Sequence, residues 1–334
     1  MAALAGCDGG GGLSDHQQLF VVDTDGSQRR QVTRGDAAHV SPSWSPDGQR
    51  LAFAATRCGS VSFEIGDLDG ARVSGLARHR TCIGDVGVAW SPRGGAIALL
   101  TRFEEPAATV TIDIVAPDGS HPRRLASFDT SILGPAGPVW SPDGSELAYA
   151  GKSGGGSFDV IVLDRNGHGR RLTSGPEDDF DPRWSPRGDS VLFARVVGRA
   201  QFALETVPAS GGGVRRLPGR WVDVDADWSP DGRSVAFTGV PAGRDGRYHL
   251  YRLDLLNGVV RELARDPAAV RPAWSPDGRR IAFATEDGRV ATVAPTGGPA
   301  ETLVDLGEAE IGDLAWSPDG RRLVFSAAKP PPED

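Results

Sequence analysis

The chain has 334 residues, including 45 Gly and 25 Pro, and a net charge of -8. This composition disfavours long helices and favours short strands joined by tight turns. No apolar run approaches the roughly 20 residues of a membrane-spanning helix. The acidic charge argues against a general nucleic-acid binder. Three cysteines are too few for a disulfide scaffold, and the six histidines show no zinc-ligand spacing.

The first segment, residues 1–17, is expected to lie outside the folded domain. Its "LAGC" (Leu4 to Cys7) resembles the bacterial lipobox, whose Cys is lipidated, and the following "DGGGG" has the composition of a flexible tether. We predict lipidation of Cys7. A lipoprotein signal also needs charged and apolar stretches before the box. The residues before Cys7 are too few to form these stretches. Either the start of the chain has been set too late, or the match to the lipobox is accidental.

From residue 18 onwards the chain repeats one phrase, "WSPDG" or "WSPRG", whose successive tryptophans stand 42 to 50 residues apart. Each phrase is followed by a short apolar strand and, in all repeats but the last, by a second hairpin with a Gly-containing turn. A period in the forties with about four strands per repeat predicts β-propeller blades. The phrase tryptophans are Trp44, Trp90, Trp140, Trp184, Trp228, Trp274 and Trp316.

The phrase is predicted to be a turn between the first two strands of a blade. Pro fixes φ at about −65°, and Gly accepts the positive φ that closes a hairpin. Arg93 and Arg187 replace the turn Asp in two copies, which a shared metal or catalytic role would not tolerate. The arginines of the second hairpins are expected on the outermost strands, where charge prevents edge-to-edge pairing.

The two ends of the repeat array are incomplete in complementary ways. Gln18 to Thr33 forms an orphan second hairpin, and Leu314 to Ala327 forms an orphan first hairpin. Together they can complete a seventh blade and close the ring. We therefore predict an all-β fold: a seven-bladed β-propeller at 18–327, its last blade closed by the N-terminal and C-terminal hairpins, with a flexible tail at 328–334.

The repeat "D…P.WSPDG..[LIV]AF" resembles that of the TolB-type propellers of bacterial cell envelopes, and the resemblance covers Gln18 to Ala327. It implies an extracytoplasmic propeller that acts as a protein-interaction or scaffolding module. TolB carries an α/β domain before a six-bladed propeller. We expect seven blades and no such domain here, so the resemblance does not imply a role in the Tol–Pal system.

Two cysteines fall in predicted loops on one face of the first whole blade. These are Cys58 and Cys82. If Cys7 is lipidated, these two are the remaining cysteines, and an even pair in an oxidising compartment favours a disulfide. We predict a Cys58–Cys82 disulfide, with two unrelated thiols as the alternative.

The crossings between blades are predicted to surround the mouth of the central channel, and they are rich in carboxylates. Ring geometry would focus the field of these charges on a protein or peptide partner, or on calcium, which accepts such oxygen ligands. The alternative is that acidic turn formers simply collect in loops. The predicted site comprises Asp36, Asp85, Asp181, Asp223, Asp225, Asp313 and, as an aromatic face for a basic peptide, Trp221.

No motif predicts catalysis. "GKSGG" (Gly151 to Gly155) matches G-x-S-x-G but falls between two predicted strands, whereas a nucleophile elbow needs a strand-to-helix turn. We predict a monomeric, non-enzymatic module with no cofactor other than the calcium considered above. It would bind no nucleic acid and reach the membrane only by its lipid anchor. The alternatives are a propeller enzyme of lyase, lactonase or hydrolase type, a small-ligand or carbohydrate-binding propeller, and a structural spacer.

Overall fold

The structure is a computed structural model that describes residues 17–57, 60–70, 72–80, 86–103, 109–129, 137–152, 156–199, 201–241, 246–264 and 269–328. All regular elements in these ranges are β-strands, which confirms the prediction of an all-β fold. The same ranges contain no helix with the length and hydropathy of a membrane span.

The strands pair antiparallel with their neighbours in sequence, and we call each four-stranded unit a blade, named by its strands. The first is β3 (Ala38–Trp44), β4 (Arg50–Arg57), β5 (Ser60–Asp67) and β6 (Val73–Arg80). The next two blades are β7 (Val86–Trp90), β8 (Ile97–Phe103), β9 (Thr109–Val115) and β10 (Arg123–Asp129), then β11 (Val139–Trp140), β12 (Glu146–Lys152), β13 (Phe158–Asp164) and β14 (Gly169–Arg171).

The β15–β18 and β19–β22 blades share one sheet, because Phe202 of β17 pairs with Trp221 of β19. Their strands are β15 (Asp179–Trp184), β16 (Ser190–Gly198), β17 (Gln201–Pro208), β18 (Arg215–Arg216), β19 (Trp221–Trp228), β20 (Ser234–Pro241), β21 (His249–Asp254) and β22 (Val260–Ala264). The β23–β26 blade follows, with β23 (Ala269–Trp274), β24 (Ile281–Thr285), β25 (Arg289–Val293) and β26 (Glu301–Asp305).

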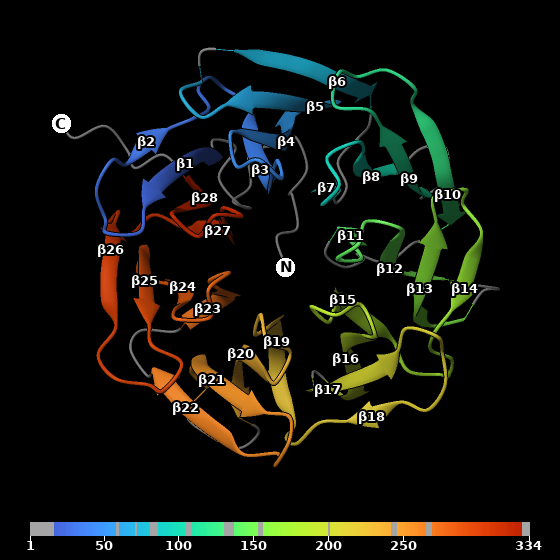
Figure 1. Ribbon diagram of the computed structural model, residues 1–334, viewed down its shortest axis with the longest axis vertical. Coiled ribbons are helices and arrows are strands. Elements are labelled where there is room, and N and C mark those ends of the chain that lie inside the picture. Colours follow the sequence, from blue (N-terminus) through green and yellow to red (C-terminus); the bar gives the residue numbers. More distant parts are fainter. Residues whose placement is uncertain are drawn as a thin grey trace.

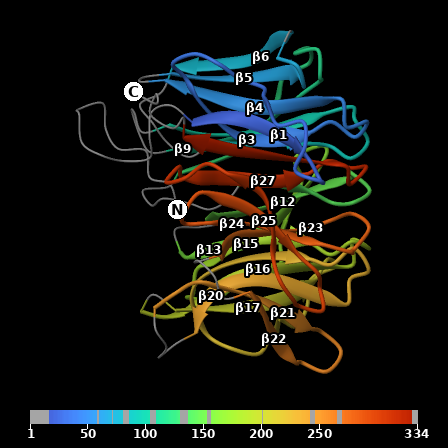
Figure 2. The ribbon, with the colours of Figure 1, turned by 90° about the vertical axis from the view of Figure 1, so that its left-hand side faces the viewer.

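One further sheet joins strands from the two ends of the chain. Its order is β2 (Arg30–Gln31), β1 (Gln17–Asp23), β28 (Arg322–Ala328) and β27 (Ile311–Trp316). β1 runs antiparallel to β28, and in the edge view of Figure 2 the blue β1 lies beside the red C-terminal strands. Figure 1 shows all the sheets set around one centre. Their innermost strands are β3, β7, β11, β15, β19, β23 and β27.

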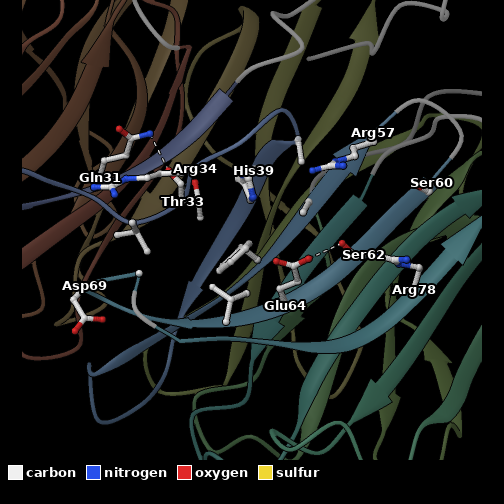
Figure 3. Close-up of a pocket in the computed structure, with 16 residues that line it drawn as sticks. Gln31, Thr33, Arg34, His39, Arg57, Ser60, Ser62, Glu64, Asp69 and Arg78 are labelled. Carbon is white, nitrogen blue, oxygen red and sulfur yellow. Dashed lines mark hydrogen bonds between the residues drawn. The ribbon is translucent and has the colours of Figure 1, made fainter.

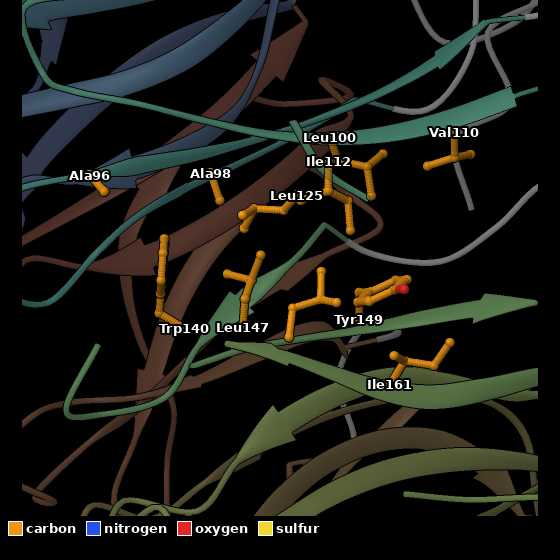
Figure 4. Packing of buried hydrophobic residues seen from close by; sticks show 11 residues of the cluster. Ala96, Ala98, Leu100, Val110, Ile112, Leu125, Trp140, Leu147, Tyr149 and Ile161 are labelled. Atoms are coloured by element: carbon orange, nitrogen blue, oxygen red, sulfur yellow. The ribbon is translucent and has the colours of Figure 1, made fainter. Parts of the chain in front are cut away.

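The hydrophobic core is divided among the contacts between neighbouring blades. Figure 4 shows one cluster, where Leu100 and Ile112 pack against Leu147 and Tyr149 of the next blade. The second strand of a blade is covered on both faces, so it appears in the sequence as a continuous apolar run. Such a core needs every blade to have a neighbour on each side.

The repeated phrase forms the predicted turn. In its first copy, Gly48 has a φ of 66° and donates its N–H to Ser45 O at 2.8 Å, while Ser45 Oγ–H donates to Asp47 Oδ1 at 2.5 Å. In the copy with Arg187 in the Asp position, Ser185 Oγ–H donates to Asp189 Oδ1 at 2.7 Å instead. The Arg187 copy thus keeps a carboxylate for the hydroxyl, so the turn does not require the phrase Asp.

Candidate functional site

Several innermost strands carry a bulge three residues before the phrase tryptophan. At this position Ser41, Asp181 and Arg271 have φ values of 53°, 50° and 54°, in a left-handed region that is uncommon for residues other than Gly. The pairing register shifts across the same position in β3, β15, β23 and β27. Such bulges re-aim side chains. We call the residues at this position the inner ring: Ser41, Gly87, Gly137, Asp181, Asp225, Arg271 and Asp313.

Three of the predicted acidic residues belong to the inner ring. Asp181, Asp225 and Asp313 occupy equivalent positions on β15, β19 and β27, strands that lie nearest the centre in Figure 1, and each is half-buried. Arg271 holds the same position on β23, between the strands of Asp225 and Asp313. The inner ring therefore combines three carboxylates with one guanidinium.

Asp313 has a structural task. Its Oδ2 accepts the backbone N–H of Ser41 at 2.8 Å and the Oγ–H of Ser326 at 3.3 Å, which ties β27 to β3. The side chain of Asp225 forms no hydrogen bond with another described residue. Asp225 is therefore the carboxylate of the ring to test first for binding, together with Asp181 at the equivalent position on the neighbouring inner strand.

The other predicted site residues are placed differently. Asp36 is exposed in the loop between β2 and β3, and Asp223 lies in β19, with its side chain outside the described part of the structure. Trp221 differs from the expected exposed aromatic face: only 6% of it is exposed, and its ring centroid lies 4.7 Å from that of Phe237. Trp221 therefore contributes to the hydrophobic core. Asp85, Cys7, Cys58 and Cys82 lie outside the described residues.

The described residues contain no group of three or more His, Cys, Asp or Glu side chains arranged to hold a metal ion. The calcium hypothesis therefore has no geometric support in this part of the chain.

Sequence reasoning missed a contact between blades that the phrase tryptophan makes. Trp228 Nε1–H donates to the carbonyl oxygen of Arg183, the residue just before the phrase tryptophan of the preceding blade, at 3.2 Å. We call this contact the indole latch. It recurs between Trp44 and Ala315, Trp140 and Ala89, Trp184 and Val139, and Trp316 and Ala273.

The other two phrase tryptophans use their backbone instead. Trp90 N–H donates to Ser43 Oγ at 2.9 Å, and Trp274 N–H donates to Asp227 Oδ2 at 2.7 Å. We call this contact the backbone latch. Loss of hydration raises the pKa of Asp227 to about 6, although the Trp274 N–H and nearby Arg183 act in the opposite direction. Asp227 is thus a charge held between two blades.

A cavity of about 540 Å³ lies between β2 and the β3–β6 blade (Figure 3). At its buried side His39 is 6% exposed, and its ring lies 5.6 Å from that of Phe53. Burial lowers the pKa of His39, while the nearby Glu64 opposes that shift. Ser62 Oγ–H donates to Glu64 Oε1 at 2.7 Å. The polar lining residues are Gln31, Thr33, Arg34, His39, Arg57, Ser60, Ser62, Glu64, Asp69 and Arg78.

Four-stranded antiparallel sheets set around one centre, with the core between them, define a β-propeller. The solved structure of an oligogalacturonate lyase from Vibrio parahaemolyticus superimposes with a TM-score of 0.67 at 14% identity, covering 95% of this chain and 98% of that one. TolB from Acinetobacter baumannii gives a TM-score of 0.54 at 18% identity, covering 95% of this chain and 65% of that one. At such low identities both likenesses show the fold alone.

In sequence, the chain is 30% identical over 151 residues to a TolB homologue of Chlorobium luteolum. The match covers 45% of this chain and 32% of that relative, so it spans about a third of the relative's length. No family model matches the chain. These likenesses make the chain a TolB-like β-propeller.

Proposed function

We propose that the chain is an extracytoplasmic module of the bacterial cell envelope that binds a protein or peptide partner at the inner ring and has no enzymatic role. The observation that carries this proposal is the equivalent placement of Asp181 and Asp225 on neighbouring inner strands. Half-buried carboxylates around one axis create a negative potential that attracts a basic segment. The TolB-like propeller supports the envelope setting.

We also propose that the propeller has seven blades and is closed by strands from both ends of the chain. The pairing of β1 with β28 from Gln17 to Asp23 supports this closure. The indole latch between Trp44 and Ala315 supports it as well, because it joins β3 to β27.

Membrane attachment through Cys7, the tether predicted at 1–17, whose last residue Gln17 is the first residue of β1, and the Cys58–Cys82 disulfide remain predictions that accompany this proposal. Mass spectrometry of exported protein would detect an acylated Cys7. Thiol titration without reductant would show no free Cys58 or Cys82 if the disulfide forms.

The binding test uses fluorescence anisotropy with a labelled Lys/Arg-rich peptide and an acidic peptide of equal length. The double variant Asp181→Asn/Asp225→Asn should bind the basic peptide about tenfold more weakly than the wild type, a change of about 1.4 kcal/mol. Asn suits position 181, because it tolerates left-handed backbone. Asp118→Asn/Asp254→Asn is the matched control, because both residues lie at turns between third and fourth strands, away from the inner strands. Equal binding by all three proteins would contradict the proposal.

A further inference from the structure

The place that the cavity occupies beside the β3–β6 blade has an equivalent in the same chain, beside the β15–β18 blade. The wall facing each blade is built alike: Thr33 Oγ1 accepts the N–H of Leu19 at 2.9 Å, and Thr173 Oγ1 accepts the N–H of Val160 at 2.9 Å. The strand pairings within the two blades also allow them to be aligned residue by residue. The equivalent residues are Ala55 and Arg195, His39 and Asp179, Phe53 and Phe193, and Glu64 and Glu205.

In the β15–β18 blade this place is filled by the side chain of Arg195. Its Nε and Nη2 donate to the Asp179 carboxylate at 2.7 and 2.8 Å, and its Nη1 lies 3.1 Å from Glu205 Oε2. The guanidinium carbon lies 5.3 Å from the centre of the Phe193 ring. A buried guanidinium is therefore accommodated between two carboxylates and an aromatic ring.

In the β3–β6 blade the arginine is replaced by Ala55, whereas two of its three partners are kept. Glu64 supplies the carboxylate and Phe53 the ring, and both line the cavity. His39 replaces the second carboxylate, and its buried Nδ1 has no hydrogen-bond partner among the described residues. An imidazole nitrogen without a proton accepts a hydrogen bond from a guanidinium. The cavity thus keeps a guanidinium-binding place without its guanidinium.

The rim of the same cavity carries the opposite charge. Arg34, Arg57 and Arg78 are exposed at its edge, and Figure 3 shows them around His39 and Glu64. None of the three forms an ion pair with another described residue. Arginine at such a rim matches the planar geometry of a carboxylate. A volume of about 540 Å³ is within the range of small-molecule sites.

We propose that this cavity binds a ligand with a guanidinium at one end and a carboxylate at the other. The guanidinium lies over Phe53 against Glu64, and the carboxylate pairs with the rim arginines. Free arginine and the C-terminal arginine of a peptide share this chemistry. The site is separate from the inner ring, so either proposal can fail without the other.

The test is isothermal titration calorimetry of the purified protein with four compounds. L-Arginine tests the whole ligand, and the tripeptide Gly-Gly-Arg tests a peptide end. Agmatine lacks the carboxylate, and L-citrulline replaces the guanidinium by a neutral urea. We expect agmatine to bind about tenfold more weakly than the better of the first two compounds, and citrulline to show no measurable binding. Equal binding of citrulline and L-arginine would overturn the proposal, as would no binding of L-arginine or Gly-Gly-Arg.

Two variants locate the binding. Ala55→Arg restores the side chain present in the other blade, so it should abolish binding of L-arginine and Gly-Gly-Arg while the fold is kept. Glu64→Gln should weaken binding at least about tenfold through loss of the charge-assisted hydrogen bond. Arg123→Gln, an exposed arginine of β10, is the matched surface control and should bind as the wild type does. If Ala55→Arg and Glu64→Gln both fold and bind normally, the cavity is not the site and the proposal is wrong.

Discussion

The indole latch and the backbone latch join neighbouring blades at the same place by different atoms of the same residue type. In the indole latch, as between Trp228 and Arg183, the ring N–H reaches a carbonyl of the preceding blade. In the backbone latch, as between Trp274 and Asp227, the main-chain N–H meets a side chain, and the ring N–H of Trp274 has no partner among the described residues.

The residue before the preceding phrase tryptophan separates the two kinds. Ser43 and Asp227 have oxygen atoms that accept a backbone N–H, and they form the backbone latch. Alanine and valine have no side-chain acceptor, and arginine is a donor only, so at those positions only the carbonyl is available. One side chain therefore determines how two blades are joined.

The largest expected effect comes from breaking the ring where chain ends meet. Deleting residues 17–33 removes β1 and β2, including the buried Leu19 and Val22, and leaves β28 as an unpaired edge. The indole latch of Trp44 to Ala315 would then have to hold β3 to β27 without the sheet around it. We expect loss of a single cooperative unfolding transition, or aggregation, in calorimetry and size-exclusion chromatography.

A protein lacking residues 329–334 is the control for this deletion and should melt as the full chain does. Normal, cooperative melting of the protein without residues 17–33 would contradict both the closure and the seven-blade proposal.

The second effect concerns charge in one backbone latch. Because the pKa of Asp227 is raised to about 6, the folded state binds its proton more tightly than the unfolded state does. Its contribution to stability is complete below the unfolded value of about 4 and is lost as pH rises through 6. Asp227→Asn stays neutral and keeps an acceptor for Trp274 N–H. Its free energy of unfolding relative to wild type should therefore rise between pH 4 and 7, by up to about 3 kcal/mol.

Urea unfolding at several pH values measures this difference. Asp227→Ala also removes the charge, but it leaves Trp274 N–H without an acceptor, so it should be about 1–2 kcal/mol less stable than Asp227→Asn at every pH. A pH-independent difference between Asp227→Asn and wild type would show that the carboxyl is not desolvated.

The third effect compares the two latches directly. Trp228→Phe removes the indole N–H from Arg183 O, whereas Trp274→Phe removes an indole N–H that has no described partner. Both lose similar packing, so the difference isolates the hydrogen bond. We expect Trp228→Phe to cost about 1–2 kcal/mol more, measured by denaturant unfolding. Equal losses would mean that the indole latch adds nothing beyond packing.

The repeat predicted the strands and turns well, because both follow from local chemistry. Pro and Gly in "SPDG" determine the turn, and the short apolar run after it is typical of a strand covered on both faces. The latches depend on which atoms of two blades meet, so they could not be read from one repeat. The residue before each phrase tryptophan was visible in the sequence, but its role required the geometry.

The candidate site was harder to predict, since position on a strand decides exposure. Asp225 and Trp221 lie four residues apart on β19, yet Asp225 belongs to the inner ring and Trp221 to the core. From loop composition alone, both residues are predicted to lie in the binding site. The cavity has no motif at all: the small side chain of Ala55 becomes informative only by comparison with Arg195, which fills the equivalent place.

The smallest expected effect comes from the other backbone latch, where the acceptor is neutral. Ser43→Ala leaves Trp90 N–H without its acceptor, which should cost about 1 kcal/mol in denaturant unfolding. Ser74→Ala, at an exposed position of β6, is the control and should be nearly neutral. Ser43→Asp keeps an acceptor but adds a charge, so it should become less stable relative to wild type as pH rises, as expected for the Asp227 latch. If Ser43→Ala and Ser74→Ala lose equally little, the tryptophan backbone contact does not contribute to stability, and only the indole latch is energetically significant.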